Sequence, residues 1–283
     1  MKIGINMLLW TATPSFKEHA HILDKLKKWG FDAFEIGVGG LSSADIASFS
    51  RRGGELGLEP CALDVYLAAD MDMISSDPEM RKKAVNFLKS CISKTRDLGA
   101  KVFSGPMFQG LVNTTQSGPS ADEWKYAVEG MRACAEFGKE KGVKLAAEPI
   151  NRFEMYLLNT LDQAYALCKE VGMDNLGILA DTHHSNIEEP DVVQSWTRVM
   201  DRIYNVHISE NNRGIPGSGH AIPPTLFDAL KKGGYDGCLT IEAFNANVPE
   251  TLPLLRLWHP FVKDTDEMAV KGLQFIKRYV HAE

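Results

Sequence analysis

Short apolar runs alternate along the chain with longer amphipathic stretches. Apolar runs of roughly four to eight residues rich in Val, Ile and Leu predict buried strands, and stretches of helical periodicity predict helices. The expected strands are Ile3–Leu8, Ala33–Val38, Pro60–Tyr66, Lys101–Met107, Val143–Ile150, Leu176–Asp181, Tyr204–Ser209 and Cys238–Ala243. The expected helices are Phe16–Trp29, Ser42–Leu56, Pro78–Leu98, Ala121–Lys141, Leu161–Val171, Asp191–Asp201, Thr225–Lys232 and Asp266–Val280.

Several expected helices carry recognisable start and stop signals. Ser42 and Asp77 stand where an N-cap side chain would accept a backbone hydrogen bond, and Pro78 suits a first turn. Glycine follows many of the helices, at Gly30, Gly57, Gly99, Gly142, Gly172 and Gly233. Glycine is the residue that most readily ends a helix. The element boundaries therefore agree with the hydrophobic pattern.

The order of the elements is strand then helix, repeated along the whole chain with no block left over. This alternation implies right-handed crossovers and a parallel sheet. Eight such units in 283 residues have the size of a closed (β/α)8 barrel. An open doubly wound sheet would normally carry a glycine-rich turn after its first strand, where this chain has Leu8-Leu9-Trp10-Thr11. We therefore expect an α/β protein, a (β/α)8 TIM barrel forming a single domain over residues 1–283.

The segments that follow the expected strands are longer and more polar than the turns that follow the helices. Phe108–Ser120 and Asn211–Pro224 follow strands, whereas Glu55–Leu58 is a short turn after a helix. Active sites of barrels lie at the carboxyl ends of the strands, in the loops that lead to the helices. The sequence therefore places its variable polar material where a barrel carries its active site.

Four late strands each deliver a possible metal ligand near their carboxyl end: Glu148, Asp181, His207 and Glu242. Because side chains alternate along a strand, Glu242 and His207 face into the barrel if Ile241 and Val206 face the helices. Three inward carboxylates without a partner would repel one another and resist ionisation. A divalent cation removes this conflict, and hard carboxylates without a thiolate suit Mn²⁺ or Mg²⁺ better than structural zinc.

Composition narrows the classes of function. The chain is 44% hydrophobic, its net charge is -6 and its pI is about 5.8, which argues against a dedicated nucleic-acid-binding protein. No apolar run reaches the length of a membrane span, and the start of the chain lacks the apolar core of a signal peptide. The five cysteines are scattered without a CxxC pair. We expect reduced thiols, no membrane association and a cytoplasmic location.

Around the four candidate ligands Glu148, Asp181, His207 and Glu242, the chain resembles the sugar isomerase/epimerase barrels. Within them it resembles the ketose 3-epimerases that act on D-tagatose, D-allulose (D-psicose) or L-ribulose. The resemblance covers nearly the whole chain. Its most specific segments are Glu148–Glu154, Asp181–Glu189, His207–His220 and Ile241–Phe244. The chain departs from the family pattern at His183, where relatives often have Phe, and at Ala243, where Pro is common. These departures bear on substrate preference more than on chemistry.

The resemblance implies a metal-dependent C3 epimerisation of free ketoses through a cis-enediolate. In this view Glu148, Asp181, His207 and Glu242 hold Mn²⁺ or Co²⁺, with Mg²⁺ as a further possibility. Glu148 and Glu242 then act as the catalytic pair, one removing the C3 proton and the other returning a proton on the opposite face. The resemblance also implies sugar binding by Glu154, His184 and Arg213, and assembly as a homodimer or homotetramer.

Other functions stay open from the sequence alone. An aldose–ketose isomerase of the hydroxypyruvate isomerase kind would share the barrel and the metal, and a dehydratase of cyclic polyols is a further possibility. Abasic-site endonucleases built on a related barrel need more His ligands and a basic face. The glycine-rich part of Asn211–His220 could instead bind a phosphate, and Arg213 could form a loop ion pair with Glu210.

The wall of the substrate pocket is the least certain part of the prediction. Trp10, Tyr66, Met107 and Phe108 are the candidates for contact with the distal carbons of a sugar, because they end or follow the early strands. The apolar segment Leu252–Trp258 could form a subunit interface or cover the mouth of the barrel.

Overall fold

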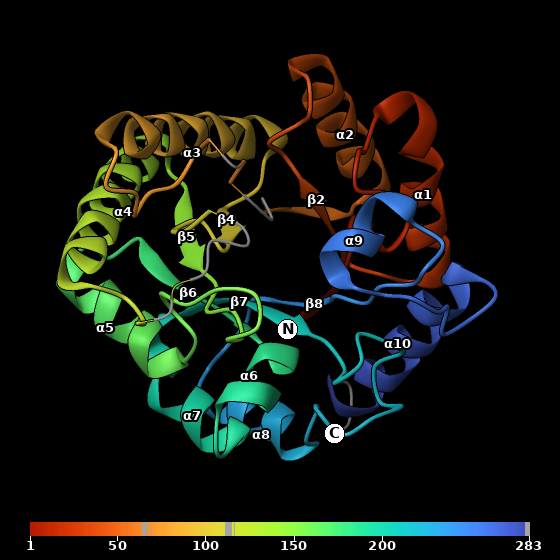
Figure 1. Cartoon of the computed structure of the whole chain (residues 1–283). Coiled ribbons are helices and arrows are strands. Elements are labelled where there is room, and N and C mark those ends of the chain that lie inside the picture. The colour runs from red at the N-terminus through yellow and green to blue at the C-terminus, as the bar shows by residue number, and fades with distance from the viewer. Residues whose placement is uncertain (64–66, 69, 111–114, 116, 281–283) are drawn as a thin grey trace.

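A computed structural model describes residues 1–63, 67–68, 70–110, 115 and 117–280. Within them a closed barrel of parallel strands runs in chain order, with β1 paired to both β2 and β8. The strands are β1 Lys2–Asn6, β2 Ala33–Gly37, β3 Glu59–Leu63, β4 Val102–Gly105, β5 Lys144–Ala147, β6 Leu176–Asp181, β7 Ile203–Ile208 and β8 Cys238–Ile241. Figure 1 shows them at the centre of a ring of helices. The predicted (β/α)8 barrel is confirmed.

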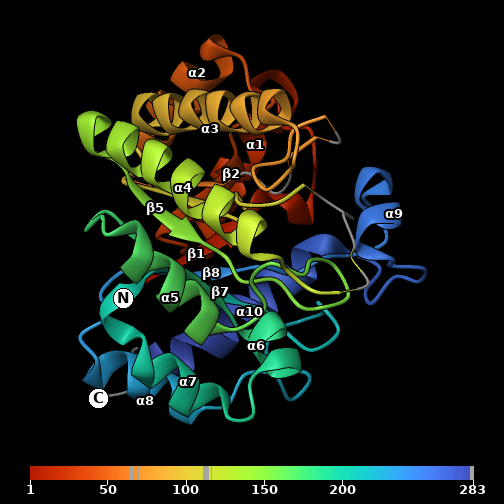
Figure 2. The same cartoon turned by 60° about the vertical axis from the view of Figure 1, so that its left-hand side comes forward.

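The α-helices are α1 Phe16–Trp29, α2 Ser43–Leu56, α3 Pro78–Leu98, α4 Ala121–Lys141, α5 Leu161–Val171, α6 Thr182–Glu188, α7 Val192–Arg198, α8 Thr225–Lys232, α9 Leu252–Leu255 and α10 Thr265–Val280. Three short 3₁₀ turns, η1 Met7–Leu9, η2 Met200–Arg202 and η3 Pro249–Thr251, complete the described elements. Among the helices of the described residues, none combines the length and the apolar character that a membrane span requires. Figure 2 shows α9 standing apart from the helical ring, at the carboxyl ends of the strands.

Several predicted helix boundaries are confirmed by the backbone. The side chain of Ser42 accepts a hydrogen bond from the amide of Asp45, and that of Asp77 accepts one from Glu79. Gly57 follows α2 in the left-handed conformation that a C-cap requires. The local signals and the hydrophobic pattern thus specify the same helices.

Several strands end earlier than the pattern predicts. β5 ends at Ala147 although the apolar run continues to Ile150, and β8 ends at Ile241 rather than Ala243. Pro149 has no N–H for the sheet, so the ladder stops beside it. The first predicted strand also ends early, because the side chain of Asn6 accepts from the amide of Leu8 and starts the turn η1. The third predicted strand reaches Tyr66, but residues 64–66 lie outside the described ones.

Two helical segments differ from the prediction. The expected helix Asp191–Asp201 is divided into α7 and η2. Helix α6 was not expected, because its seven residues lack an apolar stripe. It begins directly after β6, where the carboxylate of Asp181 accepts from the amides of His183 and His184. A candidate site residue therefore also caps the helix that follows it.

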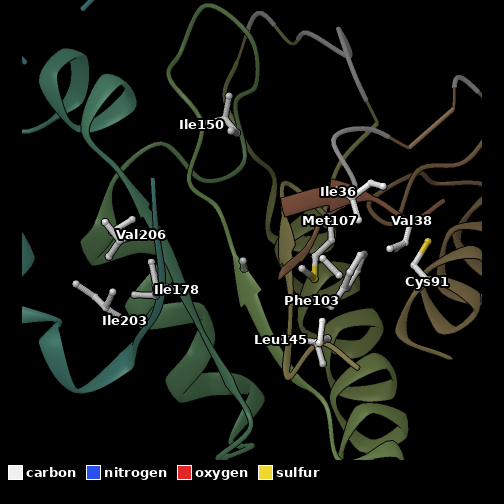
Figure 3. Packing of buried hydrophobic residues seen from close by; sticks show 14 of the residues in the cluster. Ile36, Val38, Cys91, Phe103, Met107, Leu145, Ile150, Ile178, Ile203 and Val206 are labelled. Atoms are coloured by element: carbon white, nitrogen blue, oxygen red, sulfur yellow. The ribbon is translucent and has the colours of Figure 1, made fainter. Parts of the chain in front are cut away.

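An apolar layer between strands and helices holds the barrel together. Ile36, Phe103, Leu145, Ile178 and Val206 are fully buried members of this layer, and Figure 3 shows them beside their neighbours. Leu145 packs against α4, since its Cδ1 lies 2.6 Å from the place a Cβ on Gly138 would occupy. With Leu145 directed outward, alternation along the strand directs Glu148 inward. The same alternation directs His207 inward when Val206 packs outward.

Candidate metal and active site

The four predicted metal ligands come together at the carboxyl end of the barrel. Glu148 and Glu242 follow β5 and β8 directly, Asp181 ends β6, and His207 lies within β7. Each offers one ligand atom, and these atoms all lie within 4.8 Å of one another. All four side chains are buried, with at most 6% of any residue exposed. Strand register helps to align them, because Asp181 and His207 are direct partners in the ladder between β6 and β7.

The imidazole of His207 provides a test of whether the cluster suits a cation. Its Nδ1 atom is buried and has no hydrogen-bond partner among the described residues. It faces Oε1 of Glu242 at 3.5 Å, Oδ2 of Asp181 at 3.7 Å and Oε1 of Glu148 at 3.9 Å. A buried polar atom without a partner is costly, and hard carboxylate oxygens with an imidazole nitrogen form a usual donor set for a divalent ion. These residues therefore fit a metal ion.

Arg213 reaches into this cluster from the loop after β7. Its Nη1 atom donates to Oε2 of Glu242 at 2.7 Å and to Oδ2 of Asp181 at 3.0 Å, and also bonds Ser209. Its Nη2 atom lies 3.0 Å from Nε2 of His184. The side chain is buried, and the backbone adopts φ 61°, a left-handed conformation that non-glycine residues rarely take. Arg213 thus neutralises part of the carboxylate charge.

The side chains of Glu210 and Arg213 do not form the ion pair that the sequence left open, although the backbone N–H of Arg213 donates to the carbonyl of Glu210. The carboxylate of Glu210 accepts from the amides of Asn211, Gly217 and Ala221 and so closes the loop on itself. The amides of Asn211 and Gly217, which lie within the glycine-rich segment and could otherwise bind a phosphate, are therefore already engaged, which argues against a phosphate site there.

Burial and neighbouring charges act differently on the carboxyl groups of Glu148 and Asp181. Burial raises the pKa of Glu148 well above its usual range, and the carboxylates of Glu242 and Asp181 raise it further. Burial would also raise the pKa of Asp181, but Arg213 and the nearby imidazoles outweigh it and lower the pKa. Without a cation, Glu148 therefore tends to hold a proton, and Asp181 stays ionised.

The two imidazoles next to these carboxylates also differ. Burial and the charge of Arg213 hold the pKa of His184 well below its usual value, so that ring is neutral. Burial lowers the pKa of His207 as well, but the charges of Glu35 and Glu242 outweigh this and raise it well above the usual value. In the absence of a cation, a proton on His207 partly compensates the surrounding carboxylates.

Glu154 and His184, the other predicted sugar-binding residues, lie beside the cluster and share a partner. The side-chain amide of Asn151 lies 2.6 Å from Oε1 of Glu154 and 2.9 Å from Nδ1 of His184. Nε2 of His184 lies 3.7 Å from Oε1 of Glu148. Asn151 was not predicted, although it stands within the motif that carries Glu148 and Glu154. It links the two candidate sugar contacts to each other.

A cavity of about 350 Å³ opens above the cluster. The candidate residues on its surface are Glu148, Glu154, His184, Arg213 and Glu242. Its remaining wall includes Met7, Leu8, Thr11, Ala12, Thr13 and Pro14 after β1, Gly37 and Gly40 after β2, Pro106 after β4, and Glu250, Thr251 and Leu255 after β8. The loops after the early strands therefore form part of the cavity wall, as the sequence predicts.

The particular wall residues that we expected are not the ones that line the cavity. Trp10 turns away, donates from Nε1 to Asp266 and stacks on Trp29. Met107 and Phe108 are buried in the core, and the neighbouring Pro106 lines the cavity instead. Tyr66 lies outside the described residues. A side chain at a rim can turn inward or outward, and packing decides this rather than the local sequence.

The segment Leu252–Trp258 serves in part to cover the barrel mouth. Leu255 lines the cavity, as does Thr251 just before the segment. Leu257 is buried, but Trp258 keeps 74% of its surface exposed. Covering the mouth is thus one role of the segment, and the exposed indole of Trp258 is available for contact with another subunit.

The fold and this cluster together define a class of protein: a (β/α)8 barrel with a buried carboxylate–imidazole set for a divalent cation at the floor of a cavity. The chain belongs to the xylose isomerase-like TIM barrel family, whose model matches residues 23–279.

Named relatives agree with this assignment. The chain is 33% identical to L-ribulose 3-epimerase of Mesorhizobium japonicum over 247 residues, which cover 87% of this chain and 82% of the relative. It is 30% identical to ketose 3-epimerase of Arthrobacter globiformis, over 98% of this chain and 96% of the relative. The crystal structure of D-allulose 3-epimerase from Methylomonas sp. in complex with D-allulose matches with a TM-score of 0.91 at 28% identity, covering 99% of this chain and 97% of that one. The resemblance to ketose 3-epimerases is confirmed.

Proposed function

We propose that this protein is a metal-dependent ketose 3-epimerase that inverts C3 of a free ketose. The observation that carries the proposal is the placement of two carboxylates, Glu148 after β5 and Glu242 after β8, on one cavity next to a cluster that fits a cation. Inversion needs proton transfer on both faces of the reacting carbon, and these two strands approach the cavity from well-separated positions in the ring. Relatives named as 3-epimerases support C3 as the reacting carbon.

Glu148, Asp181, His207 and Glu242 would hold the ion, and their hard donor atoms favour Mn²⁺ or Co²⁺, with Mg²⁺ as a further possibility. A bound divalent ion supplies a Lewis acid that polarises the C2 carbonyl and makes the C3 proton removable.

The protein's own residues would then move the proton. One carboxylate, Glu148 or Glu242, takes the proton from C3 as the C–H electrons form a cis-enediolate of the sugar. The other carboxylate gives a proton to C3 on the opposite face, and the ketone re-forms.

Arg213, His184 and Glu154 would bind and orient the sugar. Arg213 donates to Nε2 of His184 and both residues face the cavity, so the remaining N–H groups of the guanidinium can donate to oxygens on which negative charge develops, while His184 holds the guanidinium in place. Glu154 is held by Asn151 and can accept from a hydroxyl group. The segments that wall the cavity limit the access of water to the reacting carbon.

The test of the proposal is product analysis after incubation with D-fructose, D-tagatose and L-ribulose in added Mn²⁺. A C3 epimer as product, with solvent deuterium incorporated at C3, is the expected result. Deuterium at C1 and an aldose product would instead identify an aldose–ketose isomerase of the hydroxypyruvate isomerase kind. No conversion of any of these ketoses in the presence of bound metal would contradict the proposal.

Assembly as a homodimer or homotetramer is also part of the proposal. Phe153 and Trp258 keep 69% and 74% of their surfaces exposed. Phe153 lines a groove together with Leu257, the residue that precedes Trp258. Light scattering on the purified protein tests this, and a monomer at micromolar concentration would contradict it. The cytoplasmic location stays a prediction.

A further inference from the structure

Glu35 of β2 is a charged residue buried in the interior of the barrel, with no exposed surface. The proposed catalysis and sugar binding do not use it. Its Oε2 atom lies 2.8 Å from Nε2 of His207, and its Oε1 atom accepts from Nδ2 of Asn205 at 2.9 Å. Both oxygens of this carboxylate are therefore engaged, one of them by a ring that also belongs to the metal-binding cluster.

The contact with Glu35 determines which nitrogen of His207 carries the hydrogen. A carboxylate accepts hydrogen bonds and does not donate them, so the hydrogen lies on Nε2. In the neutral ring that binds metals, the lone pair is then on Nδ1. Nδ1 is the buried atom without a hydrogen-bond partner among the described residues, and it faces the carboxylates of Glu148, Asp181 and Glu242. Glu35 thus aims the lone pair at the centre of the cluster.

We infer that Glu35 is a positioning residue for the metal site, which fixes the tautomer and the ring orientation of His207. This inference rests on the proposed function, since it requires the cluster to bind a divalent cation. Carboxylates behind a ligating imidazole keep its ring in place and increase its basicity.

A chain of buried polar groups holds Glu35 in turn. Asn205 precedes His207 by two residues on β7, so both side chains point to the same side of the strand. Besides Glu35, the amide of Asn205 contacts Oγ of Ser104 on β4 at 3.0 Å, and Ser104 donates to the carbonyl of Ala62 on β3. Four strands thus contribute to the position of this carboxylate, which leaves it little freedom to turn away from His207.

The experiment is a calorimetric titration of the metal-free, full-length protein with Mn²⁺, comparing wild type with Glu35→Gln. Glutamine has the same shape but replaces one acceptor by an NH₂ group, so either Asn205 or His207 then faces a donor. We expect the affinity for Mn²⁺ to fall about 10–100-fold. Thr240→Val is the matched control. Thr240 is buried on β8 in register with His207, but its hydroxyl donates a hydrogen bond to Sγ of Cys238 rather than to the metal-binding cluster. The control should therefore bind Mn²⁺ like wild type.

A second measurement separates positioning from general damage to the fold. In Glu35→Gln the Mn²⁺ concentration for half-maximal activity should rise with the dissociation constant, while kcat at saturating Mn²⁺ stays close to wild type. If Glu35→Gln does not fold, Glu35→Asp takes its place, because it keeps the charge but withdraws it from His207. Wild-type Mn²⁺ affinity in the variant that folds would overturn the inference and leave the proposed metal enzyme intact. Failure of the wild-type protein to bind Mn²⁺ would instead overturn the proposed function, and the inference with it.

Discussion

The guanidinium of Arg213 and the carboxylate of Glu242 form a buried ion pair, with Nη1 of the arginine 2.7 Å from Oε2 of the glutamate. One of the two carboxylates proposed to move a proton is therefore held by the same group that is proposed to bind the sugar. Asn6 donates to the other oxygen of Glu242 at 3.2 Å. Glu148 has no hydrogen bond to its carboxylate within the described part of the chain, so the two groups of the pair have different surroundings.

This difference makes Arg213→Lys a sensitive variant. Lysine offers a single ammonium group and cannot reach Asp181, Glu242 and His184 at once, as the planar guanidinium does. Loss of a charge-assisted hydrogen bond costs about 1.5–3 kcal/mol, so kcat/KM should fall roughly 10–100-fold. Steady-state kinetics measure this. Arg152→Lys is the control, because Arg152 pairs with Glu188 with 63% of its own side chain exposed, and it should behave like wild type.

Glu148→Gln tests the proton transfer itself. The amide is close in shape but cannot take the C3 proton, and proton transfer by one group contributes roughly 10²–10⁴-fold, so kcat should fall by that factor. Glu140→Gln, at an exposed position in α4, is the control. Metal content must be measured alongside, because Glu148 is also a proposed ligand. A variant that keeps both bound metal and the wild-type rate would refute the two-carboxylate scheme.

Removal of the metal should stop turnover, and the affinity with which the protein binds the metal again should depend on pH. EDTA followed by dialysis is expected to abolish activity, and Mn²⁺ or Co²⁺ to restore it. The pKa values of Glu148 and His207 are both raised in the cation-free site, so both groups hold protons that a cation must displace. Falling pH favours the protonated, cation-free form, and the affinity for Mn²⁺ should therefore fall with it.

Calorimetry in buffers of different ionisation enthalpy measures the protons released on binding. Release of protons on binding, decreasing as pH rises through the raised pKa values, is the expected result. A Mn²⁺ affinity that does not change between about pH 5 and pH 8 would show that neither group loses a proton to the cation.

A pair of glycine variants tests the packing of the barrel. A Cβ on Gly138 of α4 would lie 2.6 Å from Cδ1 of Leu145 and 2.9 Å from the carbonyl of Val143, so Gly138→Ala should destabilise the fold by about 1–3 kcal/mol. Within the described part of the chain, Gly54 of α2 has no neighbour within 4 Å of such a Cβ, and Gly54→Ala should stabilise the fold by about 0.5–1 kcal/mol. Urea unfolding measures both, and equal effects would contradict this account of the layer between β5 and α4.

The sequence was sufficient for the barrel and for the clustering of the four candidate ligands, because both depend on periodicity. The alternation of side chains along a strand indicates whether a residue at its end points into the barrel. Strand position and this alternation together place Glu148, Asp181, His207 and Glu242 at one mouth of the barrel. Glu35 and Asn205 carry a similar signal, because each is a polar residue between apolar neighbours in a buried strand. A buried polar residue needs a partner, and in a closed barrel that partner lies across the interior.

Other parts depended on tertiary contacts that local sequence does not encode. Helix α6 has seven residues and forms where Asp181 can cap it, so its sequence alone gave little sign of a helix. Arg213 reaches the cluster through a left-handed backbone conformation that no pattern of residues required. Trp10 was expected in the pocket but finds Asp266 of α10, which is distant in sequence.

The polar chain from Ser104 through Asn205 and Glu35 to His207 crosses the middle of the barrel, where most barrels of this size are filled with branched apolar side chains. The same contacts that would orient a ligand for the cation therefore also contribute to the closure of the sheet. Ion binding and folding are then thermodynamically linked, and a cation at about 100 times its dissociation constant would add about 2.7 kcal/mol to the free energy of unfolding. The melting temperature of this protein would consequently report the concentration of free divalent ion around it.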